Sequence, residues 1–272
     1  MYVYYCCRSS YCECNEYFKK IRWCDLFFYI LFMVISVLIS GCSAQQDFSE
    51  KDLDVIDAQL ASGATENAMY ELNDLYHRYP RNYEIIMREA AANSMLQRQD
   101  AAISLYKEAL SIRPESKEAW VGLARIYINK DPSRSQKILE KITAFYPNDV
   151  HVMNDYGISL DLNGKCSEAQ EVYRKAISLD PTQISPEINL ALSLALSGDA
   201  KTGLSVIKPY AMAQDATSKV QEDYAAVLVA NGRLSEAEAI LYKYIPDKKV
   251  NEHMKKLKEI WGYKNAKVIF LH

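Results

Sequence analysis

The sequence predicts an all-α protein, an α-solenoid in which a helix–turn–helix unit repeats about six times. Prolines recur at intervals of 34, 33 and 34 residues, at Pro80, Pro114, Pro147 and Pro181. Later glycines recur at intervals of 34 residues, at Gly164, Gly198 and Gly232. A period of about 34 residues is typical of paired helices that stack in a row, because such a unit cannot bury its apolar face alone.

The composition agrees with a folded helical chain. Of 272 residues, 49% are hydrophobic, 25% are charged and only nine are glycine, which excludes global disorder and a collagen-like chain. The formal net charge of −3 lacks the strong basic excess of a nucleic-acid binder. We therefore expect no nucleic-acid partner.

Side chains recur in phase with the prolines. In the unit that starts at Val150, bulky residues stand at positions 4, 7, 11 and 24, small ones at positions 8, 20 and 27, and proline at position 32. These residues are Met153, Tyr156, Leu160, Tyr173, Gly157, Ala169, Ala176 and Pro181. This pattern resembles the tetratricopeptide repeat (TPR). Small residues let the two helices of a unit approach closely, and proline ends the second helix.

We expect the repeat array to occupy residues 49–244. Its units start near Ser49, at Tyr83, Lys117, Val150 and Ile184, and near Ser218. The first unit fits the pattern weakly in its first helix, and the third has lost one residue before Ser135. Pro209 falls inside the second helix of the fifth unit and should kink or shorten it.

The segment 245–272 is expected to cap the array. Residues 243–267 carry eight lysines against Asp247, Glu252 and Glu259. One interpretation is a solvated capping helix, which a solenoid needs at its end. The other is a contact with a partner or with lipid head groups.

Residues 1–41 have the features of an export signal. Basic residues precede a 14-residue stretch, Leu26 to Ile39, that is apolar except for Ser36 and is shorter than the ~20 residues of a membrane-spanning helix. The sequence Ile39-Ser40-Gly41-Cys42 that follows resembles the bacterial lipobox. The resemblance implies that Cys42 becomes the lipidated N-terminus, that residues 42–48 form a tether, and that Ser43 favours the outer membrane. The alternative is an uncleaved anchor. The Tyr- and Cys-rich residues before the basic run suggest an over-extended translation start.

Five of the seven cysteines precede residue 25. Their spacing matches no zinc signature, and they are expected to be absent from the mature protein. Cys166 would then be the one thiol left, at a helix start, which can lower a thiol pKa. The sequence nevertheless favours a packed or merely tolerated cysteine over a reactive one. No nucleophile–base pair or metal motif is visible, so we expect no enzyme activity, metal, cofactor or small-molecule substrate.

The TPR resemblance implies that the first helix of each unit lines a concave, partner-binding face through positions 2, 5, 6, 9 and 12. The candidate residues are Arg125, His151, Asn154, Asp155, Asp161 and Asn189. The lysines of a co-chaperone carboxylate clamp are missing from these positions, which disfavours a partner with an acidic C-terminus.

A lipobox followed by TPR units resembles the TadD family of Flp (tight adherence) pilus assembly proteins. The resemblance implies a lipid-anchored scaffold of the bacterial envelope that binds proteins of a pilus or secretin machine. Its expected place is the outer membrane, facing the periplasm. Three alternatives stay open: a TPR pilotin lipoprotein of type IV pili, the TPR lipoprotein of outer-membrane β-barrel assembly, and a regulator that recruits a peptidoglycan enzyme.

Overall fold

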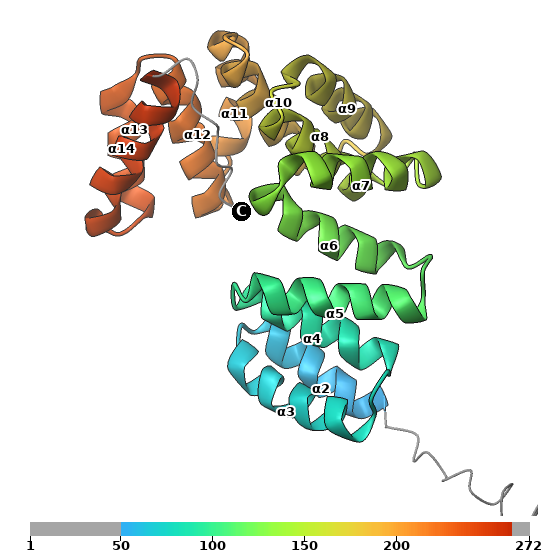
Figure 1. Cartoon of the computed structure of the whole chain (residues 1–272). Helices are drawn as coiled ribbons and strands as arrows, with labels where there is room; N and C mark the ends of the chain where they lie inside the picture. Colours follow the sequence, from blue (N-terminus) through green and yellow to red (C-terminus); the bar gives the residue numbers. More distant parts are fainter. Residues whose placement is uncertain (1–49, 263–272) are drawn as a thin grey trace, which may run out of the picture. The chain divides into compact units, whose positions relative to one another are not determined.

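The computed structural model describes residues 50–262, with side chains from Leu53 onward. This part of the chain forms thirteen α-helices and contains no strand. Figure 1 shows the helices joined by short turns and following one another in chain order. The predicted all-α repeat fold is confirmed.

Each unit consists of a first helix, here the A helix, and a second helix, the B helix, that packs against it. The A and B helices of the six units are α2 (Glu50–Ala61) and α3 (Thr65–Arg78), α4 (Tyr83–Met95) and α5 (Gln99–Ile112), α6 (Lys117–Lys130) and α7 (Pro132–Phe145), α8 (Val150–Leu162) and α9 (Cys166–Leu179), α10 (Ser185–Leu196) and α11 (Ala200–Ala211), and α12 (Ser218–Ala230) and α13 (Leu234–Tyr244).

One small residue per unit, at position 20, lies where the B helix packs against its A helix. All six are buried: Ala68, Ala102, Ser135, Ala169, Gly203 and Ala237. At two of these sites the neighbour is a main-chain carbonyl of the A helix. The Ser135 hydroxyl donates to the Ala124 oxygen at 2.9 Å, and a β-carbon on Gly203 would lie 2.5 Å from the Ala191 oxygen. A larger residue at position 20 would push the two helices apart.

The turn between A and B helices needs a residue in the left-handed region. Gly63, Gly164, Gly198 and Gly232 fill this place with φ between 73° and 100°, and Gln97 fills it in the second unit with φ of 59°. Glycine suits it because it has no β-carbon to clash with the backbone.

The third unit lacks this left-handed residue. Only Asp131 separates α6 from α7, and it is both the C-cap of α6 and the N-cap of α7. Its carboxylate accepts a hydrogen bond from the amide of Arg134 at 3.1 Å. The missing residue explains the one 33-residue interval.

In the fifth unit, Pro209 lies in the last turn of α11. The helix has 12 residues, against 14 in α9 of the preceding unit. Proline lacks the amide that would continue the hydrogen-bond ladder, which agrees with the predicted shortening.

A last helix, α14 (Asp247–Gly262), packs on α12 and α13. Val250, Met254 and Leu257 are buried on the face toward the array, while the outer face carries exposed Lys255 and Lys258. α14 therefore closes the apolar end of the last unit with a polar surface.

The predicted signal segment 1–41, the whole predicted tether 42–48 with Cys42, and residues 263–272 of the predicted C-terminal segment lie outside the described residues. Among the helices of residues 50–262, none combines the length and the apolar content that a bilayer crossing requires.

Candidate functional site

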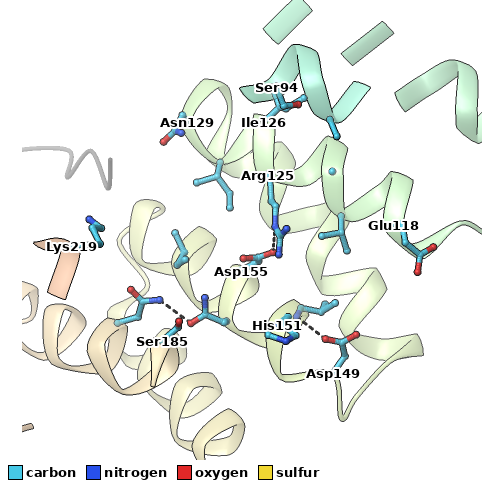
Figure 2. Close-up of a pocket in the computed structure, with 18 of the residues that line it drawn as sticks. Ser94, Glu118, Arg125, Ile126, Asn129, Asp149, His151, Asp155, Ser185 and Lys219 are labelled. Atoms are coloured by element: carbon cyan, nitrogen blue, oxygen red, sulfur yellow. Dashed lines mark hydrogen bonds and ion pairs between the residues drawn. The ribbon is translucent and has the colours of Figure 1, made fainter. Parts of the chain in front are cut away.

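The A helices line a groove of about 900 Å³, here called the A-helix groove. Its walls come from α4, α6, α8, α10 and α12, with Gln99 and Tyr106 of α5 at one side. Figure 2 shows side chains of these helices pointing into the groove. It contains five of the six predicted contact residues: Arg125, His151, Asn154, Asp155 and Asn189.

Arg125 and Asp155 form an ion pair across the groove wall. The Arg125 Nε of α6 donates to the Asp155 Oδ2 of α8 at 2.7 Å (Figure 2). The two side chains differ in burial, with 56% of Arg125 and 10% of Asp155 exposed. Because the guanidinium is the exposed partner, it is the part of the pair that a ligand in the groove meets first.

Two asparagines connect the next pair of A helices. Asn189 of α10 donates its side-chain amide to the Asn154 oxygen of α8 at 2.8 Å. Asn189 is buried, Asn154 is half-buried, and the neighbouring His151 is exposed. An asparagine amide has two donors and an oxygen with two lone pairs, so each retains hydrogen-bonding capacity beyond this contact.

The sixth predicted residue, Asp161, does not line the groove. It is 6% exposed and accepts hydrogen bonds from the Ser193 hydroxyl of α10 at 2.6 Å and the Tyr173 hydroxyl of α9 at 3.1 Å. Burial raises its pKa to about 6, and the hydrogen bonds from Ser193, Cys166 and Tyr173 oppose that rise. Asp161 holds three helices together inside the array.

Cys166 is a partly buried free cysteine, which agrees with the packed cysteine that the sequence favours. It begins α9, where a helix N-terminus would lower a thiol pKa. Burial instead raises the pKa of Cys166 to about 11, and the nearby Asp161 carboxylate raises it further. The thiol is therefore a packed group and a poor nucleophile.

Sequence reasoning missed several groove residues. Lys117 Nζ pairs with Asp149 Oδ2 at 2.9 Å, and Lys219 Nζ pairs with Asp223 Oδ1 at 3.0 Å. Asp149 was detectable, because it is the N-cap of α8 and its carboxylate accepts from the Val152 amide. Lys117 stands at position 1 of its unit, which the pattern does not mark. Lys219 and Asp223 stand at positions 2 and 6 of the last unit, so the pattern could have found them.

The three cations Lys117, Arg125 and Lys219 are each paired with an aspartate in or beside the groove. The wall is thus polar and balanced in charge at these points, without a single-sign patch. It suits an extended or helical protein segment that carries both amide groups and charges. Among residues 50–262, no three His, Cys, Asp or Glu side chains gather closely enough to hold a metal ion.

Comparison with protein families identifies the repeat. Tetratricopeptide repeat models match residues 96–153 and 151–183. The fold is a TPR solenoid. The TPR fold is generally a protein-interaction scaffold, and no catalytic family is indicated for this chain.

The curated relatives of this TPR solenoid match only a part of it. An uncharacterized protein, y4yS, from Sinorhizobium fredii is 27% identical over 104 residues, which are 38% of this chain and 57% of that protein. Superkiller protein 3 of Saccharomyces cerevisiae is 33% identical over 104 residues, 38% of this chain and 7% of that protein. The chain thus spans about half the length of the first relative and a small part of the second.

Several solved TPR structures share the fold over most of the chain. PilW, described as a widely conserved type IV pilus biogenesis factor, has a TM-score of 0.64 at 18% identity, covering 76% of this chain and 97% of PilW. Pseudomonas aeruginosa PilF has a TM-score of 0.58 at 15% identity, covering 76% and 96%. YrrB, described as having an unusual peptide-binding site, has a TM-score of 0.50 at 14% identity, covering 66% and 90%. At these identities the likeness shows the fold alone.

Proposed function

We propose that this chain is a lipid-anchored scaffold of the bacterial envelope that supports assembly of a pilus or secretin machine by holding a protein partner in the A-helix groove. The observation that carries the proposal is the groove itself. Five A helices line it, and α6, α8 and α10 with the N-cap Asp149 present paired charges and amides along its wall. Such a surface recognises a polypeptide through many moderate contacts.

Two further observations support the choice of machine. The lipobox at Ile39–Cys42 indicates an anchor at a membrane, and anchored TPR proteins are the architecture that the TadD family resemblance implies. PilW, a pilus biogenesis factor by its description, shares the fold across nearly its whole length. This likeness favours type IV pili as the second candidate machine beside the Flp pilus.

The proposal is tested by affinity capture from membranes with the full chain, followed by identification of the captured proteins. The groove variant is Arg125→Glu, which places a carboxylate against Asp155 and removes the exposed guanidinium. The matched control is Lys141→Glu, the same charge reversal on the exposed face of the B helix α7. We expect the parent and the control to retrieve a secretin or pilus assembly protein, and the groove variant to lose it while keeping its helical circular dichroism.

The identity of the captured protein distinguishes the candidates. An Flp or a type IV pilus component selects between the two pilus machines. A peptidoglycan hydrolase or a β-barrel assembly protein would replace the pilus function by one of the other envelope functions. Equal capture by parent and Arg125→Glu would refute the groove as the binding surface.

A further inference from the structure

A side pocket of about 190 Å³ opens from the A-helix groove between α6, α8 and the start of α10, here called the arginine pocket. Arg125 of α6, His151 and Asn154 of α8, and Ser185 of α10 line both the pocket and the groove. Figure 2 shows Arg125, His151 and Ser185 coming from these three helices. The volume equals that of roughly six water molecules in the liquid, so the pocket admits one side chain of a partner and no helix.

Asp155 holds the guanidinium of Arg125 through one nitrogen. The Nε atom donates to Asp155, whereas Nη1 and Nη2 donate no hydrogen bond within residues 50–262. The nearly buried carboxylate therefore fixes the direction of a guanidinium whose two outer nitrogens remain available. Two parallel N–H groups of a guanidinium match the two oxygens of a carboxylate.

Three more donors line the pocket without a partner in the described part of the chain. They are the amide nitrogen of Asn154, the hydroxyl of Ser185 and the ring of His151. Asn154 uses only its oxygen, which accepts from Asn189. In addition, no side chain caps α10, because Ile184 stands at its N-cap position, and the free amides of a helix N-terminus attract an anion.

The acidic groups of the neighbourhood are already bonded. Asp155 is the one acidic residue among the described residues that line the pocket, and it accepts from Arg125. Asp149 and Asp180 interact electrostatically with His151, and each accepts hydrogen bonds from a neighbour of its own. The unused groups of the pocket are thus mainly donors, which select a ligand with negative charge and hydrogen-bond acceptors.

We propose that the arginine pocket binds the side-chain carboxylate of an aspartate or glutamate from the segment that the A-helix groove holds. This inference rests on the function proposed above and names the group of the partner that the groove selects. The carboxylate accepts from Nη1 and Nη2 of Arg125 and from Ser185 or Asn154. A neutral amide fits less well, because its own N–H groups would face these donors.

The course of the groove favours a side chain over a chain terminus. The lining of the groove runs from α4 to α12, whereas the arginine pocket branches from it at α6, α8 and α10. A segment that follows the groove therefore passes the mouth of the pocket with its main chain and reaches Arg125 with one side chain.

The test follows the Nε–H resonance of Arg125 by NMR in the full chain, held in detergent micelles and labelled at its arginine nitrogens. The probe is the blocked peptide acetyl-Ala-Glu-Ala-amide, and the matched neutral probe is acetyl-Ala-Gln-Ala-amide. We expect a saturable shift and about tenfold tighter binding of the glutamate probe, since a charge-assisted hydrogen bond is the stronger kind. Arg134, whose guanidinium lies 4.3 Å from the ring centroid of Tyr127, is the internal control and should not shift.

Two variants locate the binding. Ser185→Ala should weaken binding of the glutamate probe about threefold, because it removes one neutral hydrogen bond. Ser167→Ala changes an exposed serine at the start of α9 and is the matched control, which should bind as the parent does. Arg125→Gln should abolish the preference for glutamate over glutamine, measured through the ring resonances of His151, while the helical circular dichroism is unchanged.

The outcomes separate this inference from the proposed function. Equal binding of the two probes would overturn the carboxylate, even if Arg125→Glu still loses the captured partner and the proposed function stands. A third probe, acetyl-Ala-Gln-Ala with a free C-terminus, tests the alternative source of a carboxylate. If it shifts the Arg125 resonance as strongly as the glutamate probe does, the pocket binds a chain terminus and the assignment to a side chain fails.

Discussion

Tyr173 of α9 lies against the backbone of Gly157 in α8 so closely that a β-carbon on Gly157 would be 2.3 Å from the Tyr173 Cε1 atom. Tyr173 is completely buried, and its hydroxyl donates to Asp161. The ring is therefore held at both its edge and its tip. This contact joins the small position 8 of the A helix to the bulky position 24 of the B helix.

Replacing Gly157 with alanine should destabilise the array. The new methyl group cannot be accommodated without moving Tyr173, and overpacking typically costs about 1–3 kcal/mol. The better helix propensity of alanine returns up to about 1 kcal/mol, so we expect a net loss that lowers the denaturant midpoint. Gly262→Ala is the control, because no atom lies within 4 Å of its added β-carbon. An unchanged midpoint for Gly157→Ala would show that the ring moves freely.

Asp161 should make stability depend on pH. Its folded-state pKa of about 6 lies above its ordinary value of 3.8, so the folded chain binds more protons between these values. Unfolding free energy therefore falls as pH rises from about 4 to about 6, by an amount on the order of 3 kcal/mol at 1.36 kcal/mol per pKa unit. Asp161→Asn should remove this component of the fall, as measured by urea unfolding across the range.

Ser193→Ala provides the opposite comparison for Asp161. The Ser193 hydroxyl donates to the carboxylate and lowers its pKa, so its loss should raise that pKa further and extend the decline in stability to higher pH. Parallel pH profiles for the parent and Asp161→Asn would mean that the carboxylate ionises in the folded chain as it does in the unfolded one.

Gln97 occupies a left-handed position that four other turns fill with glycine. A side chain in this region costs about 1–2 kcal/mol, and part of this is offset because glycine has the greater entropy in the unfolded chain. We expect Gln97→Gly to stabilise the array by about 0.5–1 kcal/mol. Gln97→Ala keeps the β-carbon and should give no gain in thermal unfolding. A loss of stability with glycine would indicate that the glutamine side chain makes a compensating contact.

Cys42 is predicted to accept the lipid. Cys42→Ala should leave an uncleaved precursor that incorporates no labelled fatty acid, since the thiol is the acceptor. Cys24→Ala, which changes a cysteine before the apolar stretch, should be labelled and cleaved as the parent is. Normal labelling of the Cys42 variant would end the lipoprotein hypothesis.

The sequence specifies much of the fold because one physical requirement recurs in every unit. Position 20 must be small, and its periodic occurrence from Ala68 to Ala237 sets the register of all six helix pairs. The first helix of the first unit fits the repeat pattern weakly but still forms, as α2. Stacking on the next unit supplies stability that its own side chains do not.

The candidate site is less predictable for a related reason. The TPR resemblance implies that position 12 lines the groove, but Asp161 stands at the end of α8, where Ser193 and Tyr173 donate to its carboxylate. These partners lie 32 and 12 residues away, and no periodic signal links them. The position of a residue in its helix gives the direction of its side chain. Whether that side chain is buried depends on which side chains of the neighbouring units pack against it.

The single-residue connection at Asp131 has a consequence for how the chain avoids exchanging helices with another copy. If Asp131 became helical, α6 and α7 would merge into one rod, and the freed half could pair with a second molecule in a domain swap. Pro132 opposes this merger, because within a continuous helix its ring would clash with the Ile128 carbonyl and no amide would complete the ladder. The single-residue connection between α6 and α7 is thus followed by a proline that keeps the two helices separate and paired within one chain.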